Sequence, residues 1–142
     1  MRTYRTKSKQ LPGSSYKELI AKARQEYHKI QKRTPRRVPY VRSAYFTKHK
    51  IFVNSFWDHL SQKSPRDRVR RLKLYPCAIE LIRNSKATPD SMQNPNNKNE
   101  NLHKLKGITP DGIHFAVQIK ENKRTGRKDF ISAFPSKQKE SK

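Results

Sequence analysis

The sequence is poor in hydrophobic residues and in cysteine. Only 32% of its 142 residues are hydrophobic, and Cys77 is its one cysteine. A single cysteine excludes an internal disulfide and a cysteine-based zinc site, and its apolar neighbours indicate a buried residue in a reducing compartment, the cytoplasm. No apolar run approaches the roughly 18–20 residues that span a bilayer, and no apolar segment follows the basic N-terminus. We therefore expect neither a membrane partner nor a secretion signal.

Acidic residues are also scarce. The chain has 11 of them against 34 lysines and arginines, which gives a formal net charge of +23. This imbalance favours polyanionic partners and salt-sensitive binding. The length leaves room for one main domain with a flexible arm. We expect a basic arm and a helix over residues 1–40, with residues 1–12 disordered, then the main domain over 41–136 and a disordered basic tail over 137–142.

Local signals predict where the first helix begins and ends. Ser15 and Glu18 form an S-x-x-E capping box, and apolar residues recur at helical spacing behind it. Pro35 and Pro39 cannot continue that helix, so the stretch that contains them is expected to be extended.

The middle of the chain predicts further helices. An apolar and aromatic stripe indicates a second helix over His49–Ser61. Ser64 followed by Pro65 is a typical start of a third helix, and the chain restarts at Pro76 to continue to about Asn84. The polar run over 85–101 has almost nothing to bury and is expected to be a long loop.

The segment Leu102–Pro135 predicts a three-strand meander. Its first turn, Thr109–Gly112, has proline and glycine where a tight turn requires them. In the second strand the apolar residues alternate with His114, Ala116, Gln118 and Lys120, so one face suits a hydrophobic core and the other a ligand. The expected fold class is α+β, with N-terminal helices packed on a small C-terminal antiparallel β-sheet.

Two acidic residues match the PD…ExK pattern of metal-dependent nucleases. In that chemistry Asp111 and Glu121 would have to share a metal ion. Here they bracket a single strand of about ten residues, so they are expected to lie on the order of 30 Å apart. We interpret the match as accidental and expect no metal site and no cofactor.

Cleavage of RNA by its own 2′-hydroxyl remains compatible with scattered carboxylates. It needs a base, an acid and groups that stabilise the phosphorane oxygens. The meander carries His103 as base or acid, Lys104 and Lys120 as phosphate stabilisers, and Ser132 as a hydroxyl that orients the phosphate. Each of these residues also has an ordinary structural interpretation.

Other basic residues are candidates for contacts with nucleic acid. They lie at the start of the predicted second helix, along the face of the third helix, and on the second and third strands with the turn between them. These candidates are His49, Arg66, Arg70, Arg71, His114, Arg124, Arg127 and Lys128.

The segment HKLKGITPDGIHFAVQIKENKRTGRKDFISAFP, with the lead-in FWDHLSQKSPRDRVRRLKLYPCAIELIRNS, resembles the phage and mobile-element proteins of the barnase–EndoU–colicin–RelE-like ribonuclease superfamily. The resemblance covers roughly Ile51–Pro135. It implies helices before a curved antiparallel sheet and metal-independent RNA cleavage, often of mRNA on the ribosome or of tRNA. It carries the site roles over to His103, Lys104, Lys120 and Ser132. Because no acidic base is expected near the sheet face, the base would be His103 or a lysine.

Two functions remain open. The first is a metal-independent endoribonuclease of the toxin type, neutralised by an acidic antitoxin or immunity protein. The second is a non-catalytic basic protein that binds RNA or DNA, or a subunit of a ribonucleoprotein complex, which the net charge fits equally well.

Overall fold

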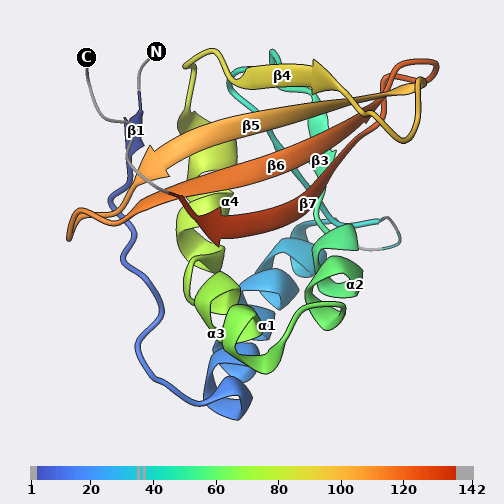
Figure 1. Cartoon of the computed structure of the whole chain (residues 1–142). Helices are drawn as coiled ribbons and strands as arrows, with labels where there is room; N and C mark the ends of the chain where they lie inside the picture. Colours follow the sequence, from blue (N-terminus) through green and yellow to red (C-terminus); the bar gives the residue numbers. More distant parts are fainter. Residues whose placement is uncertain (1–2, 35, 37, 137–142) are drawn as a thin grey trace.

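The computed structural model describes residues 3–34, 36 and 38–136. Within these residues the chain forms four α-helices and one seven-stranded sheet, so the α+β class is confirmed (Figure 1). The helices are α1 (Tyr16–Arg33), α2 (Ser55–Ser61), α3 (Pro65–Lys73) and α4 (Tyr75–Asn84). The strands are β1 (Tyr4–Arg5), β2 (Tyr40–Arg42), β3 (Lys50–Phe52), β4 (Asp90–Gln93), β5 (Glu100–Ile108), β6 (His114–Asn122) and β7 (Lys128–Pro135).

The predicted meander forms the centre of the sheet. Strands β5, β6 and β7 pair antiparallel, and β7 continues through β3 to β2. Both β4 and the short β1 pair with β5, β4 antiparallel and β1 parallel. The turn between β5 and β6 has the predicted conformation, with Gly112 at a φ of 91°. The sheet is therefore larger than the small sheet that we expected.

Three segments differ from the expectation because they pair with other strands, which their own residues do not indicate. Within the predicted disordered arm, Tyr4 and Arg5 pair with β5, and the backbone amides of Lys7 and Ser8 donate to Glu80, each at 2.8 Å. The predicted disorder is therefore wrong for residues 3–12. The predicted tail over 137–142 lies outside the described residues.

The predicted second helix is also partly wrong. Its first residues form β3, which pairs in parallel with β7 through Ile51 and Lys128, and helix α2 starts only at Ser55. His49 therefore precedes a strand and does not lie at a helix N-terminus. The predicted loop over 85–101 likewise contains β4 and the first two residues of β5, because β4 pairs with β5.

The other helix signals are confirmed because they act locally. The Ser15 hydroxyl accepts from the Glu18 backbone amide at 3.2 Å, and the Ser64 hydroxyl accepts from that of Asp67 at 3.3 Å. Proline lies in the first turn of α3 and of α4, where a missing amide hydrogen costs no helical hydrogen bond.

The core joins the helices to one face of the meander, which we call the inner face. Phe56 of α2 stacks on Phe130 of β7 with ring centroids 4.9 Å apart, and Phe115 and Val117 of β6 are fully buried. Apolar residues of α1 belong to the same core, so this core spans the expected domain boundary at residue 40. In the described part of the chain, no helix is both long and apolar enough to cross a membrane.

Candidate active site

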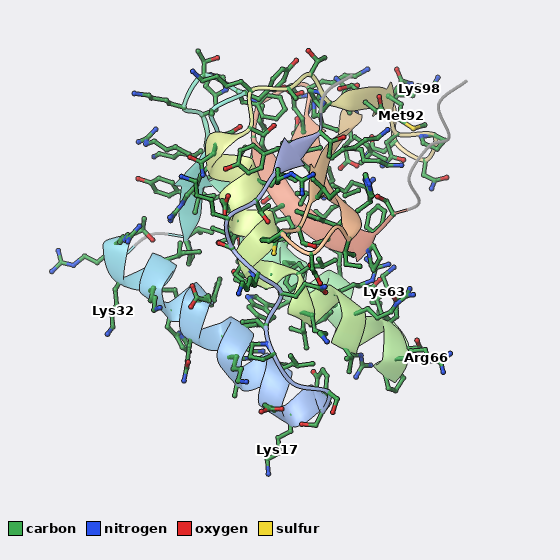
Figure 2. The ribbon with its side chains drawn as sticks, turned by 90° about the vertical axis from the view of Figure 1, so that its left-hand side faces the viewer. Lys17, Lys32, Lys63, Arg66, Met92 and Lys98 are labelled. Atoms are coloured by element: carbon green, nitrogen blue, oxygen red, sulfur yellow. The ribbon has the colours of Figure 1, made fainter. Side chains whose placement is uncertain are left out.

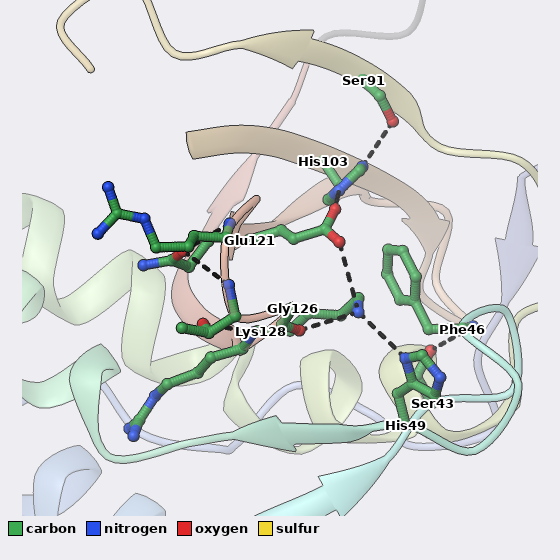
Figure 3. A network of polar contacts seen from close by, with 12 residues as sticks. Ser43, Phe46, His49, Ser91, His103, Glu121, Gly126 and Lys128 are labelled. Atoms are coloured by element: carbon green, nitrogen blue, oxygen red, sulfur yellow. Dashed lines mark hydrogen bonds and ion pairs between the residues drawn. The ribbon is translucent and has the colours of Figure 1, made fainter. Parts of the chain in front are cut away.

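His103 lies on the inner face, near the end of the sheet where β5 begins. It is opposite Ile119 of β6 and Ser91 of β4, and it is 8% exposed. Its Nε2 lies 2.7 Å from Oε1 of Glu121, and its Nδ1 lies 2.6 Å from the Ser91 hydroxyl (Figure 3). An ionised carboxylate accepts only, so Nε2 carries the hydrogen of the first bond. The contact with Glu121 therefore fixes the orientation of the His103 ring and places a hydrogen on its Nε2.

Glu121 is the acidic group that the sequence interpretation missed. Its second oxygen lies 3.6 Å from the ammonium of Lys128. Burial alone would raise the pKa of Glu121, but the hydrogen bond from His103 and the charge of Lys128 outweigh burial and lower that pKa below its ordinary value. The expectation that no acidic group lies near the sheet face is therefore wrong, and Glu121 is an ionised carboxylate at neutral pH.

Lys128 joins this pair to a second histidine. Its side chain is only 5% exposed, and its ammonium donates to Nδ1 of His49 at 3.1 Å and to the carbonyl of Gly126 at 3.2 Å (Figure 3). Because an ammonium group cannot accept, Nδ1 of His49 must be the acceptor. In the free protein Nδ1 of His49 therefore carries no hydrogen.

The loop over residues 43–49 covers part of this cluster. The Phe46 ring lies 5.0 Å from the His103 ring and 5.1 Å from the Lys128 ammonium. The backbone amide of Phe46 donates to the buried Ser43 hydroxyl at 3.1 Å. Thr47 and Lys48 adopt positive φ values of 54° and 64°. We call His49, His103, Glu121 and Lys128 the inner-face cluster, and Phe46 partly shields it.

The other predicted catalytic residues lie on the opposite, outer face of the meander. Lys104 pairs across the strands with Gln118, and Gln118 with Ser132. Side chains of neighbouring residues in a strand point to opposite faces, so Lys104 points away from the side on which His103 lies. Lys120 lies 3.8 Å from Glu100, and the Ser132 hydroxyl accepts a hydrogen bond from Arg71 of α3. The four predicted residues therefore do not form one site.

The outer face is less uniformly polar than expected. Ala116 is fully buried there, beside Phe134, and the guanidinium of Arg71 lies 5.4 Å from the Phe134 ring. Part of this face forms a hollow of about 270 Å³ whose lining includes Met92, Leu102 and Lys104.

Several predicted nucleic-acid contacts already have partners inside the protein. Arg70 and Arg71 pair with Asp67 at 3.2 and 3.1 Å, and these contacts outweigh burial and hold the pKa of Asp67 below its ordinary value. Arg127 pairs with Asp129 at 3.3 Å, and its guanidinium lies 4.3 Å from the Phe52 ring.

The remaining predicted contacts are more open, although to different degrees. Arg66 is exposed on α3 and projects away from the ribbon (Figure 2). Arg124 is exposed in the β6–β7 turn, and His114 is half-buried at the start of β6.

The structure agrees with the rejection of the PD…ExK match. Asp111 accepts a hydrogen bond from the Thr109 hydroxyl at 2.5 Å, before β6 begins, whereas Glu121 lies near the far end of that strand. Among the described residues, no group of three or more histidine, cysteine or acidic side chains is arranged to hold a metal ion.

Comparisons with models of protein families, with curated proteins and with solved structures returned no match for this chain.

Proposed function

We propose that the protein is a metal-independent endoribonuclease whose chemistry takes place at the inner-face cluster. The observation that carries this proposal is the unbroken chain of contacts from His103 through Glu121 and Lys128 to His49. A carboxylate and an imidazole thus lie on either side of a buried ammonium. This is the set of groups that attack by a 2′-hydroxyl requires.

Each member has a role that follows from its contacts. The ionised Glu121 accepts the proton of the 2′-hydroxyl, whose oxygen attacks phosphorus. The bond from phosphorus to the 5′-oxygen breaks, and the leaving oxygen takes a proton from His49. Lys128 stabilises the charge on the non-bridging oxygens. The products are a 2′,3′-cyclic phosphate and a 5′-hydroxyl.

His49 must gain a proton before it can act as the acid. In the free protein its Nδ1 accepts from Lys128. A phosphodiester that accepts the hydrogen bonds of Lys128 would free Nδ1 of His49 to take up a proton. Substrate binding would thereby prepare the acid, while His103 holds Glu121 in place and Ser91 holds His103.

His49 is exposed and Glu121 is half-buried, but access to the buried His103 and Lys128 would require the loop over residues 43–49 to move. Phe46 shields Lys128 and His103, so RNA would reach Lys128 only after this ring is displaced. An aromatic ring at that place would then be available to stack on a base of the bound RNA.

The proposal extends to the family, the RNA target and the protein partner of the chain. The helices that precede an antiparallel meander support the resemblance to the barnase–EndoU–colicin–RelE-like superfamily. We propose that the protein acts in the cytoplasm on mRNA at the ribosome or on tRNA. We also propose an acidic antitoxin or immunity protein, which a net charge of +23 would attract. Lys104 and Lys120 would serve as outer-face contacts to RNA.

The test is cleavage of an RNA oligonucleotide by the purified protein in excess EDTA. We expect a product with a 2′,3′-cyclic phosphate, and no cleavage where a 2′-deoxynucleotide precedes the scissile bond. His49→Ala should abolish cleavage, whereas His28→Ala, which removes an exposed imidazole from α1, should not. Cleavage of the deoxy-substituted oligonucleotide, or full activity of His49→Ala, would refute the mechanism.

One observation favours the second function, binding of nucleic acid without catalysis. Both ring nitrogens of His103, both oxygens of Glu121 and the ammonium of Lys128 already have internal partners, as expected of a network that only supports the fold. Under this alternative the protein would bind the RNA with a steep salt dependence and leave it intact.

A further inference from the structure

A second polar cavity lies away from the inner-face cluster. It has a volume of about 270 Å³ and is formed by the N-terminal segment, α1 and α4. Its polar lining includes Ser8, Glu26, Lys29, Arg33, Glu80 and Arg83. The cavity shares none of its lining residues with the inner-face cluster.

The two carboxylates of this cavity, Glu26 and Glu80, already have partners within the protein. Glu80 accepts from the Tyr4 hydroxyl at 2.8 Å and from two backbone amides of the N-terminal segment. These donors outweigh burial and hold the pKa of Glu80 below its ordinary value. Glu26 pairs with Lys29 at 3.1 Å. Neither carboxylate contacts an arginine of the cavity through an ion pair.

Two arginines are left without a partner. Among the described residues, the side chains of Arg33 and Arg83 form no hydrogen bond and no ion pair. Burial lowers the pKa of Arg83, and the positive charge of Arg33 lowers it further, while the nearby Tyr75 acts in the opposite direction. The two guanidinium groups therefore repel each other in the free protein.

Helix dipoles account for each arginine by itself but not for the pair. Arg33 ends α1 and Arg83 lies in the last turn of α4, where a positive side chain is stabilised by the helix C-terminus. That effect gives no reason for both guanidinium groups to line one cavity, where each disfavours the charge of the other. An anion between them would remove the repulsion.

We propose that Arg33 and Arg83 form a phosphate-binding site between α1 and α4. The planar forks of two guanidinium groups match the oxygens of a phosphate group, which can accept two hydrogen bonds from each. The phosphate could belong to a free nucleotide or to a nucleic-acid backbone. The site does not depend on RNA cleavage, because none of its residues belongs to the proposed catalytic machinery.

The experiment follows the Nε–Hε signals of the arginine side chains by NMR during three titrations of the full chain. The probes are inorganic phosphate, AMP and a 2′-O-methylated RNA oligonucleotide, which 2′-hydroxyl attack cannot cleave. We expect the signals of Arg33 and Arg83 to shift together. Arg83→Gln should weaken binding about tenfold or more, as expected when charged hydrogen bonds are lost.

Lys32→Gln is the matched control. Lys32 lies next to Arg33 on α1, is exposed and projects into solvent (Figure 2), and its replacement changes the net charge by the same amount. We expect the control to bind within about twofold of the wild type, because an exposed charge makes only a screened contribution. Arg33→Gln, at an exposed position, tests the site by a second variant that should not disturb folding.

The outcomes separate the two sources of phosphate. Shifts with inorganic phosphate and AMP would support a site for a free nucleotide, and shifts with the oligonucleotide alone would support a backbone contact. The proposal is overturned if no probe shifts both signals, or if Lys32→Gln weakens binding as much as Arg83→Gln does.

Discussion

The inner and outer faces of the β5–β7 meander both carry lysines, but the side chains differ in their burial and in their contacts. On the inner face, Lys128 is 5% exposed and lies between Glu121 and His49. On the outer face, Lys120 is 36% exposed and lies 3.8 Å from Glu100. The comparison shows that burial and convergence single out the candidate site, whereas the density of basic residues does not.

The largest expected difference between the faces is in stability. Phe115→Ala removes a fully buried inner-face ring and should lower the free energy of unfolding by about 3–5 kcal/mol. Lys104→Ala removes an exposed outer-face side chain and should change it by about 0.5 kcal/mol or less. Urea denaturation measures both. Equal effects would show that the inner face does not form the core.

A smaller difference is expected between the two lysines. Lys128→Met leaves the carboxylate of Glu121 without its buried cation and should cost about 1–3 kcal/mol of unfolding free energy. Lys120→Met should cost at most about 1 kcal/mol, because its ion pair is long and accessible to solvent. Adding Glu121→Gln to Lys128→Met should restore part of the loss. If the second change adds a further loss instead, the two side chains are not coupled.

The smallest expected effect is a dependence of stability on pH. The pKa of Glu121 in the folded protein lies below its ordinary value of 4.5. Its contribution to stability is therefore fully present above pH 4.5 and is lost as the pH falls through the lowered pKa. Glu121→Gln should flatten the loss of stability in acid, and Glu100→Gln on the neighbouring strand is the control. Thermal unfolding from pH 7 downward measures the effect, and an unchanged slope in Glu121→Gln would contradict it.

The parts of the fold that local chemistry determines were predictable from the sequence. The Ser15 and Ser64 caps and the turn around Gly112 depend on residues within a few positions, and each is confirmed. In contrast, β1, β3 and β4 are short strands that form because a longer strand pairs with each of them, β5 with β1 and β4, and β7 with β3. Their own residues indicate an arm, a helix and a loop.

The candidate site was only partly predictable for the same reason. The sequence predicts His103 as a catalytic residue, and His49 and Lys128 only as candidates for contacts with nucleic acid. The strand between Asp111 and Glu121 keeps their carboxylates too far apart to share a metal ion, but strand length does not predict which other residues lie near Glu121. The pairing of His103 with Ile119 brings Glu121 diagonally next to His103, and this register becomes known only with the structure.

The most direct test of the central claim compares RNA cleavage in EDTA by Glu121→Gln and Lys104→Gln, each against the wild type. If the chemistry takes place at the inner-face cluster, Glu121→Gln should lower the rate about 100-fold or more, as expected for loss of a general base. Lys104→Gln should lower it less than about fivefold, the limit for a surface charge worth about 1 kcal/mol. Full activity of Glu121→Gln together with an inactive Lys104→Gln would contradict the account and return the site to the outer face.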